Sequence, residues 1–174
     1  MQETVQNSAA MSPACRPGAS SCVIAIGGLD PGGGAGLIRD HLTAMTLGGR
    51  SILVGTAWTR QDERGVCGIE LRHPNMLRTA IEHALESCDP RLTAIKVGMT
   101  GHAAAISAIV AGLRTWTGPV VFDPVLGASS GGSALFQGAA ADTLPLVRRA
   151  TLLTPNLAEA SWLLGHPVST REEA

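Results

Sequence analysis

Short apolar runs recur along the chain and alternate with stretches whose apolar residues repeat at helical spacing. Most residues of these runs are apolar and many are β-branched, which is typical of strands covered on both faces of a parallel sheet. The predicted strands span residues 23–26, 52–54, 92–97, 120–122 and 151–153. Residues 66–72 alternate between apolar and polar side chains, which predicts a half-exposed strand forming a small flap at the sheet edge.

Helical periodicity is clear in four segments, and a fifth is weaker. The predicted helices span residues 38–45, 77–85, 106–113 and 157–164, with 137–147 as the weaker candidate. Strands and helices that alternate in this order predict an α/β fold with right-handed crossovers. We therefore expect a three-layer αβα domain with a mostly parallel sheet.

The residues with unusual chemistry follow the carboxyl ends of the predicted strands. They are the glycine-rich stretch Gly27–Gly36, Gln61, Gly98–Met99, Asp123–Pro124 and Pro155–Asn156. In open α/β sheets, ligands bind in the crevice outside these strand ends, so the pattern predicts one common site. Ordinary turns also explain glycine and proline, but they explain Asp123 and Gln61 less well.

Composition narrows the class of protein. With 174 residues, 45% hydrophobic and 16% charged, the chain fits one globular domain, which we assign to residues 22–174 after a disordered leader at 1–21. A net charge of −1 favours neither a nucleic-acid partner nor an anionic membrane. No run approaches the roughly 18 apolar residues of a membrane span. Four cysteines without C-x-x-C spacing, and a leader without a signal-peptide pattern, predict a cytoplasmic protein.

The glycine-rich stretch does not fit the common phosphate-binding fingerprints. No G-x-G-x-x-G can be laid on it, because Leu37 and Arg39 stand where the last glycine would fall. A P-loop needs Gly-Lys, and Lys96 is the only lysine of the chain. The glycines therefore favour close approach of the main chain to a flat ligand.

Five sequence blocks carry a specific resemblance. They are IGGLDPGGGAG (26–36), RQDERGV (60–66), KVGM (96–99), DPVLGASSGG (123–132) and LTPNLAEASWLLG (153–165). In this order and spacing, the chain resembles the hydroxymethylpyrimidine and phosphomethylpyrimidine kinases of thiamine biosynthesis, a branch of the ribokinase-like superfamily. The resemblance implies a ribokinase-like fold and phosphoryl transfer to a small pyrimidine, with ATP and Mg²⁺ as cofactors.

The resemblance also implies a pocket for the pyrimidine ring. Its residues would be Asp30, Ala35, Thr59, Gln61, Met99 and Val125. The Gln61 amide can donate to and accept from an aminopyrimidine, while Ala35, Met99 and Val125 offer apolar contacts. We expect Trp58 and Trp162 in the core, with stacking of Trp58 on the ring as an alternative.

For the phosphate end, the resemblance implies Asp123 and Glu159 as Mg²⁺ ligands and Asn156 as a phosphate ligand. Carboxylates together with phosphate and water oxygens form a typical magnesium shell. Taken alone, a glutamate at this position is more often a carboxylate that stabilises a helix start, and the resemblance reverses this preference. Lys96 stands at a strand end and could pair with a site carboxylate, although the sequence does not say which.

The chain also departs from the family pattern. Ser129 stands where the family commonly has lysine, and the family's later Gly-Thr-Gly segment and catalytic base would lie beyond Ala174. We therefore expect an incomplete C-terminal end, no catalytic base, and negligible turnover by these 174 residues alone. A homo-oligomer or a further C-terminal segment would then cover the open sheet edge. Two alternatives stay open: a non-catalytic pyrimidine-binding regulatory module, and a pyridoxal-type kinase.

Overall fold

The predicted parallel sheet is present. The computed structural model describes residues 21–62, 65–127, 134–170 and 173. Six strands of this part form one sheet in the order β3-β2-β1-β4-β6-β8. Their bounds are β1 Cys22–Leu29, β2 Arg50–Asp62, β3 Gly65–Leu71, β4 Thr93–Val97, β6 Val120–Phe122 and β8 Leu152–Leu153. All neighbours in the sheet run parallel except β3, which pairs antiparallel with β2 at the edge, as predicted for the flap.

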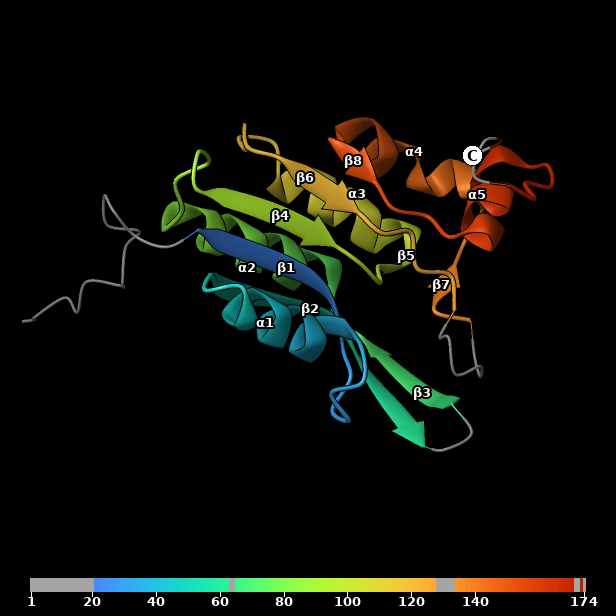
Figure 1. The fold of residues 1–174 in the computed structure, drawn as a ribbon, viewed down its shortest axis with the longest axis horizontal. Coiled ribbons are helices and arrows are strands. Elements are labelled where there is room, and N and C mark those ends of the chain that lie inside the picture. Colours follow the sequence, from blue (N-terminus) through green and yellow to red (C-terminus); the bar gives the residue numbers. More distant parts are fainter. Residues whose placement is uncertain (1–20, 63–64, 128–133, 171–172, 174) are drawn as a thin grey trace, which may run out of the picture.

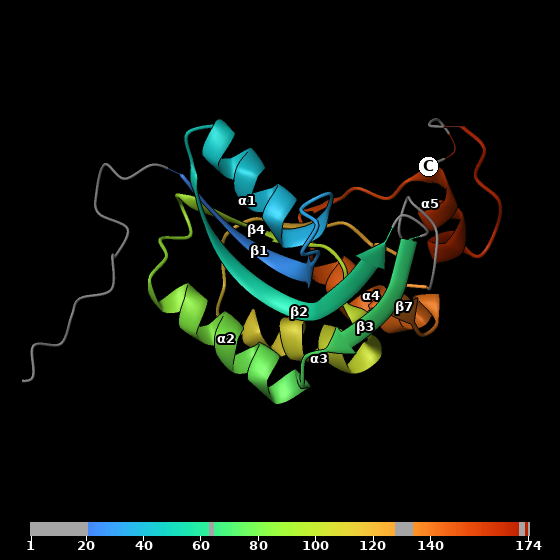
Figure 2. The same ribbon diagram turned by 90° about the horizontal axis from the view of Figure 1, so that it is seen from below.

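The five expected helices are also present, and the first four form two layers. They are α1 Gly36–Thr46, α2 Pro74–Glu86, α3 Ala103–Gly112, α4 Ala140–Arg149 and α5 Leu157–Leu164. Figure 2 shows α1 on one face of the sheet and α2 and α3 on the other, with α4 beside α3 (Figures 1 and 2). The three-layer αβα prediction is therefore confirmed. Across the described residues, no helix combines the length and the apolar character needed to cross a bilayer.

The main core lies between the sheet and the layer formed by α2, α3 and α4. Ile24 and Ile95 from the strands and Ile81 and Ile109 from the helices are completely buried there. Burial of an aliphatic side chain of this size stabilises the fold by about 1.5–3 kcal/mol, so the predicted apolar runs supply much of the driving force. Trp162 packs against this core and meets Phe136 edge to face, with ring centroids 5.7 Å apart.

Strand β2 is longer than its apolar run predicts, and it contains a β-bulge. Gly27 of β1 lies opposite Gly55, but the next residue, Gly28, lies opposite Ala57, which makes Thr56 the extra residue of β2. The Thr56 hydroxyl donates to the Met99 carbonyl at 2.7 Å and anchors the bulge to the segment after β4. Beyond the bulge, β2 curves away from the sheet and pairs with β3 (Figure 2).

The sequence did not predict two short strands. β5 (Gly101–His102) and β7 (Phe136–Gln137) pair in parallel as a separate two-stranded sheet. Two residues are too few to show periodicity, so no pattern could have indicated them. The weaker helix candidate begins three residues late, because Gln137 belongs to β7, and α4 contains Pro145 in its interior. The expectations for the leader 1–21, apart from Ser21, and for Ser129 lie outside the described residues.

Candidate active site at the carboxyl end of the sheet

A pocket of about 480 Å³ lies at the carboxyl ends of β1, β4 and β6, beside the N-terminus of α1. Six of the residues assigned from the sequence line it: Asp30, Ala35, Thr59, Met99, Asp123 and Val125. Six glycines contribute to the same lining, so much of the pocket surface is main chain. The convergence expected from the strand ends is therefore present for these residues.

Asp30 shapes the glycine-rich loop from inside. Its Oδ1 accepts a hydrogen bond from the Gly32 N–H at 2.8 Å, and its Oδ2 accepts from the N–H groups of Gly34 and Ala35, both at 3.1 Å. The side chain is buried. A buried carboxylate is stable when such donors surround it, so the loop and the charge stabilise each other. Asp30 lines the pocket, but its observed hydrogen bonds go to its own loop.

Two glycines of the glycine-rich stretch lie in close contact with neighbouring atoms. Gly36 has a φ of +58°, and a Cβ there would collide with the Gly28 carbonyl oxygen. A Cβ on Gly28 would lie 2.7 Å from Met99 Sδ. Glycine is therefore required at Gly36, where the backbone is left-handed and meets main chain, whereas a side chain at Gly28 would have to displace the Met99 thioether. Because these positions carry no side chain, the start of α1 can approach β1, and Met99 can pack against main chain.

The side of the pocket near the flap is apolar. Met99 belongs to a small buried cluster with Ala57, Val66 and Leu135, and Val125 packs against it. The Thr59 hydroxyl donates to the Leu29 carbonyl at 3.2 Å, which ties β2 to the start of the glycine-rich loop. This arrangement provides an apolar wall suited to a flat ring.

The opposite end of the pocket is charged. Lys96 Nζ lies 3.1 Å from Asp40 Oδ2 and 3.9 Å from Asp123 Oδ2, and all three residues line the pocket. Burial raises the pKa of the Asp123 carboxyl, the Lys96 ammonium lowers it, and the Asp40 charge raises it further. The sequence left the partner of Lys96 open, and the structure shows two.

Asp40 was missed by sequence reasoning, although a signal existed. It stands four residues after Gly36 in α1, so it shares a helix face with the residue that enters the pocket. A carboxylate at that position, together with the only lysine of the chain at the end of β4, could have indicated the pair.

Asn156 and Glu159 do not line this pocket. They form a reciprocal capping box at the start of α5, in which the Glu159 N–H donates to Asn156 Oδ1 and the Asn156 N–H donates to Glu159 Oε2, both at 2.9 Å. The Glu159 side chain is buried. The structure therefore gives both residues a role in starting the helix, and within the described residues no group of three or more His, Cys, Asp or Glu side chains could hold a metal ion.

Two further residues, Gln61 and Trp58, complete the comparison with the sequence analysis. Gln61 lies on β2 opposite Val66, and its side chain is outside the described part of the structure. Trp58 is 63% exposed, so the expectation of a core tryptophan was wrong. The physical reason is strand alternation: Ala57 packs in the buried cluster with Met99 and Thr59 lines the pocket, so Trp58 between them points to the other face of the strand.

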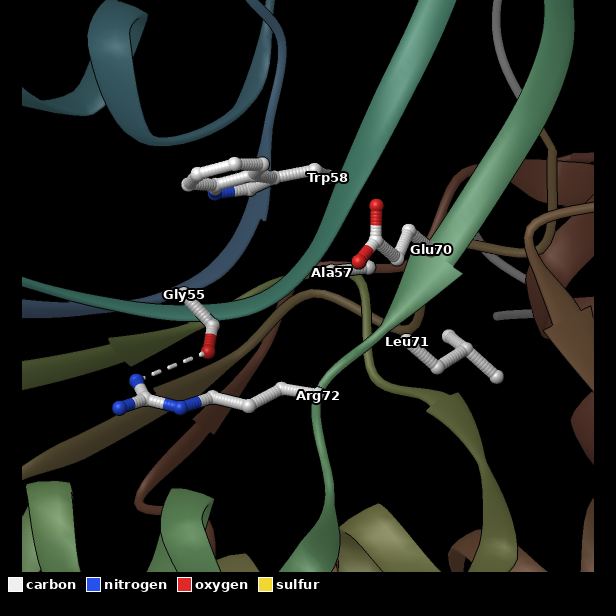
Figure 3. A pocket seen from close by; sticks show the side chains of 6 residues that line it. All are labelled: Gly55, Ala57, Trp58, Glu70, Leu71 and Arg72. Carbon is white, nitrogen blue, oxygen red and sulfur yellow. Dashed lines mark hydrogen bonds between the residues drawn. The ribbon is translucent and has the colours of Figure 1, made fainter.

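Trp58 instead lines a separate hollow of about 380 Å³ beside β2 and the end of β3 (Figure 3). Its lining consists of Gly55, Ala57, Trp58, Glu70, Leu71 and Arg72. The Arg72 guanidinium donates to the Gly55 carbonyl at 3.4 Å and covers the edge of β2 before the pairing with β3 begins (Figure 3). None of the residues assigned to catalysis or binding from the sequence lines this hollow.

A three-layer domain with a pocket at the carboxyl ends of parallel strands and an antiparallel edge flap defines the class of ribokinase-like small-molecule kinases. Residues 30–174 match the phosphomethylpyrimidine kinase family. The chain belongs to this family. A hydroxymethylpyrimidine/phosphomethylpyrimidine kinase of Rhizobium meliloti is 35% identical over 157 residues, which cover 88% of this chain and 57% of the relative. The chain thus spans little more than half the length of that relative.

Solved structures agree. The phosphomethylpyrimidine kinase of Clostridium difficile 630 has a TM-score of 0.78 at 30% identity, covering 88% of this chain and 67% of that one. The pyridoxal kinase of Staphylococcus aureus, solved with AMP-PCP and pyridoxal, has a TM-score of 0.72 at 25% identity, covering 89% and 55%. The fold prediction is confirmed by both, and the family resemblance by the first.

Proposed function

We propose that this chain carries the pyrimidine-binding pocket of a hydroxymethylpyrimidine/phosphomethylpyrimidine kinase, which transfers a phosphoryl group from ATP in thiamine biosynthesis. The observation that carries the proposal is the pocket at the ends of β1, β4 and β6, with an apolar wall at one end and charged groups at the other. A volume of about 480 Å³ suits a small heterocycle. Family membership supports the same reaction.

At the ring end, we assign binding to the glycine-rich loop and the Met99 wall. Met99 and Val125 would pack on the faces of the pyrimidine, Ala35 would border it at the start of α1, and Gln61 would pair with its polar edge. Asp30 would act by holding the loop N–H groups in place. The chain would thus orient the ring and keep water from its apolar faces.

At the phosphate end, we assign the Mg²⁺ site to Asp123, with Glu159 as second carboxylate and Asn156 for the phosphates. The Asp123 carboxylate lines the pocket and accepts no hydrogen bond from the described residues, so its oxygens fit a hard cation. The capping box engages Glu159 Oε2 and leaves Oε1 outside the pair. When bound, Mg²⁺ would neutralise charge on the transferred phosphoryl group.

We further propose that the phosphate cradle and the catalytic base lie in the part of the relatives that this chain does not match, since it covers 57% of the Rhizobium protein. The described residues would then bind and orient the pyrimidine, and phosphoryl transfer would need that additional part.

Blocking the pocket tests the proposal directly. Ala35 is the extended residue before α1 and lines the pocket, so Ala35→Leu adds bulk there while its N–H can still donate to Asp30. Titration calorimetry with hydroxymethylpyrimidine should show affinity reduced by at least roughly tenfold. Ala139→Leu is the matched control, because Ala139 is the exposed, extended residue before α4 and lies outside the pocket. Equal affinity of both variants for the pyrimidine would refute the assigned site.

A pyridoxal-type kinase is the second candidate, favoured by the likeness to the Staphylococcus aureus pyridoxal kinase. Competition between hydroxymethylpyrimidine and pyridoxal for the chain separates the two. We expect the pyrimidine to bind more tightly and Gln61→Ala to weaken the pyrimidine more than pyridoxal. Tighter binding of pyridoxal would reverse the assignment.

A further inference from the structure

The contacts of Lys96 are unequal. Its ammonium lies at hydrogen-bonding distance from Asp40, at 3.1 Å, but at 3.9 Å from Asp123. The three groups come from three elements: Asp40 from α1, Lys96 from β4 and Asp123 from the end of β6. The direct contact therefore belongs to the carboxylate that was assigned no role, and the longer one to the carboxylate proposed for the cation.

The surroundings hold Lys96 in this place. Lys96 sits in β4 between Ala25 of β1 and Val121 of β6, and its side chain is 28% exposed. A Cβ on Gly98 would lie 3.0 Å from Lys96 Nζ, so the glycine after β4 leaves the space that the ammonium occupies. The lysine is thus fitted into the pocket and does not extend freely into solvent.

We propose that Asp40 is a positioning residue that anchors Lys96 and keeps its ammonium from closing on Asp123. Held in this way, Lys96 balances part of the negative charge at this end of the pocket, while the Asp123 carboxylate stays open to an incoming cation. The part of this proposal that concerns the cation rests on the proposed function, but the anchoring of Lys96 does not.

Removing the anchor has a defined consequence. In Asp40→Asn, Lys96 loses its hydrogen-bonded carboxylate, and Asp123 is the acidic partner that remains within its reach among the described residues. A closer Lys96–Asp123 pair would compete with a divalent cation for the same oxygens. In Lys96→Met, no such competitor exists, and Asp40 should then matter little for the cation.

The anchoring can be observed without any ligand, because Lys96 is the only lysine of the chain. Lysine labelled with ¹³C at Cε therefore gives NMR signals from a single side chain. We expect distinct shifts for its two Hε protons in the wild type, and a changed, averaged signal in Asp40→Asn. Asp89→Asn removes a carboxylate that pairs with Arg91 and should leave the signal unchanged. Asp40→Ala, which removes the acceptor altogether, serves as a second variant if Asp40→Asn does not fold. An unchanged Lys96 signal in a folded position-40 variant would overturn the proposal.

Manganese binding, followed by electron paramagnetic resonance, tests the consequence for the cation. In the presence of Lys96, Asp40→Asn should weaken Mn²⁺ binding roughly tenfold. In the Lys96→Met background the same substitution should change it by no more than about twofold, because the effect passes through Lys96. Equal losses in both backgrounds would mean that Asp40 acts only by its charge, and the positioning role would fall. If the wild type binds no Mn²⁺, the cation assignment of the proposed function fails, while the NMR measurement still decides whether Asp40 anchors Lys96.

Discussion

The two ends of the pocket are held in different ways. At the ring end, main chain sets the shape: Asp30 accepts three backbone hydrogen bonds, and Gly28 packs directly on Met99. At the end proposed for the phosphates, side chains are assigned to the ligand, and two of them, Asn156 and Glu159, bond each other's backbone at the start of α5 and do not line the pocket. The ring end thus depends on backbone conformation, and the proposed phosphate binding depends in part on groups that already contribute to a helix start.

This difference separates two kinds of effect. Substitutions of the ring-end glycines should act mainly through folding, because an added Cβ atom would collide with neighbouring atoms. Substitutions at the phosphate end can be chosen to keep the structural contact and change only the charge. Stability measurements therefore suit the first end, and cation-binding measurements suit the second.

The largest effect is expected for Gly36→Ala. Alanine there would combine a left-handed φ of +58° with a collision against the Gly28 carbonyl. We expect the free energy of unfolding, measured in urea, to fall by at least about 3 kcal/mol. Gly48→Ala is the control, because Gly48 has a φ of +76° but a Cβ added to it would meet no atom within 4 Å, so it should lose only about 1 kcal/mol. Equal losses would show that the close approach to Gly28 is not what requires glycine.

A smaller effect should distinguish the two roles of Glu159. Glu159→Ala removes the capping box and should lower the free energy of unfolding by about 1 kcal/mol, whereas Glu159→Gln keeps an acceptor for the Asn156 N–H and should leave it nearly unchanged. If Glu159 also holds Mg²⁺, Glu159→Gln should still weaken Mn²⁺ binding severalfold. Asp142→Asn changes the corresponding carboxylate of α4 and should not affect Mn²⁺. Unchanged Mn²⁺ binding in Glu159→Gln would leave Glu159 with the cap alone.

The smallest effect concerns pH. Burial raises the pKa of the Asp123 carboxyl above its ordinary 3.8. A carboxyl with a raised pKa holds its proton more tightly in the folded chain, so it favours folding at low pH, and that contribution is lost as the pH rises through the folded pKa. We expect Asp123→Asn to become more stable relative to the wild type as the pH rises above about 4. The free energy of unfolding in urea, measured for both proteins at several pH values, checks this. A constant difference between the two across this range would mean that the carboxyl titrates normally.

Much of the fold follows from local pattern. The runs at 23–26 and 120–122 became β1 and β6 because nearly every residue in them is apolar, and the stripe at 77–85 became α2 with Pro74 in its first turn. Strand β5 and strand β7 could not be predicted, since two residues carry no period.

The sequence predicts a site residue well when its position at a strand end places it. It does not predict a role that depends on which neighbouring side chain the residue contacts. Asp123 and Met99 follow strand ends, so the topology alone brings them together. The distances from Lys96 Nζ to Asp40 and to Asp123 differ by less than 1 Å, and these residues come from elements far apart in sequence. Such a small difference decides the pairing and cannot be inferred from the sequence. The same holds for Asp30. Its hydrogen bonds to its own loop depend on the backbone conformation of that loop, which the residue types alone do not determine.

The bulge at Thr56 sets the phase of β2. If the same residues paired with β1 without a bulge, Thr56 would lie opposite Gly28, and every later side chain of β2 would turn to the opposite face. Trp58 would then point inward and Thr59 outward. A large indole would then occupy the space where the pocket now receives a small hydroxyl. Thr56, the extra residue of the bulge, lies before Trp58 and Thr59 in the chain. It thus decides whether this cavity is open or filled.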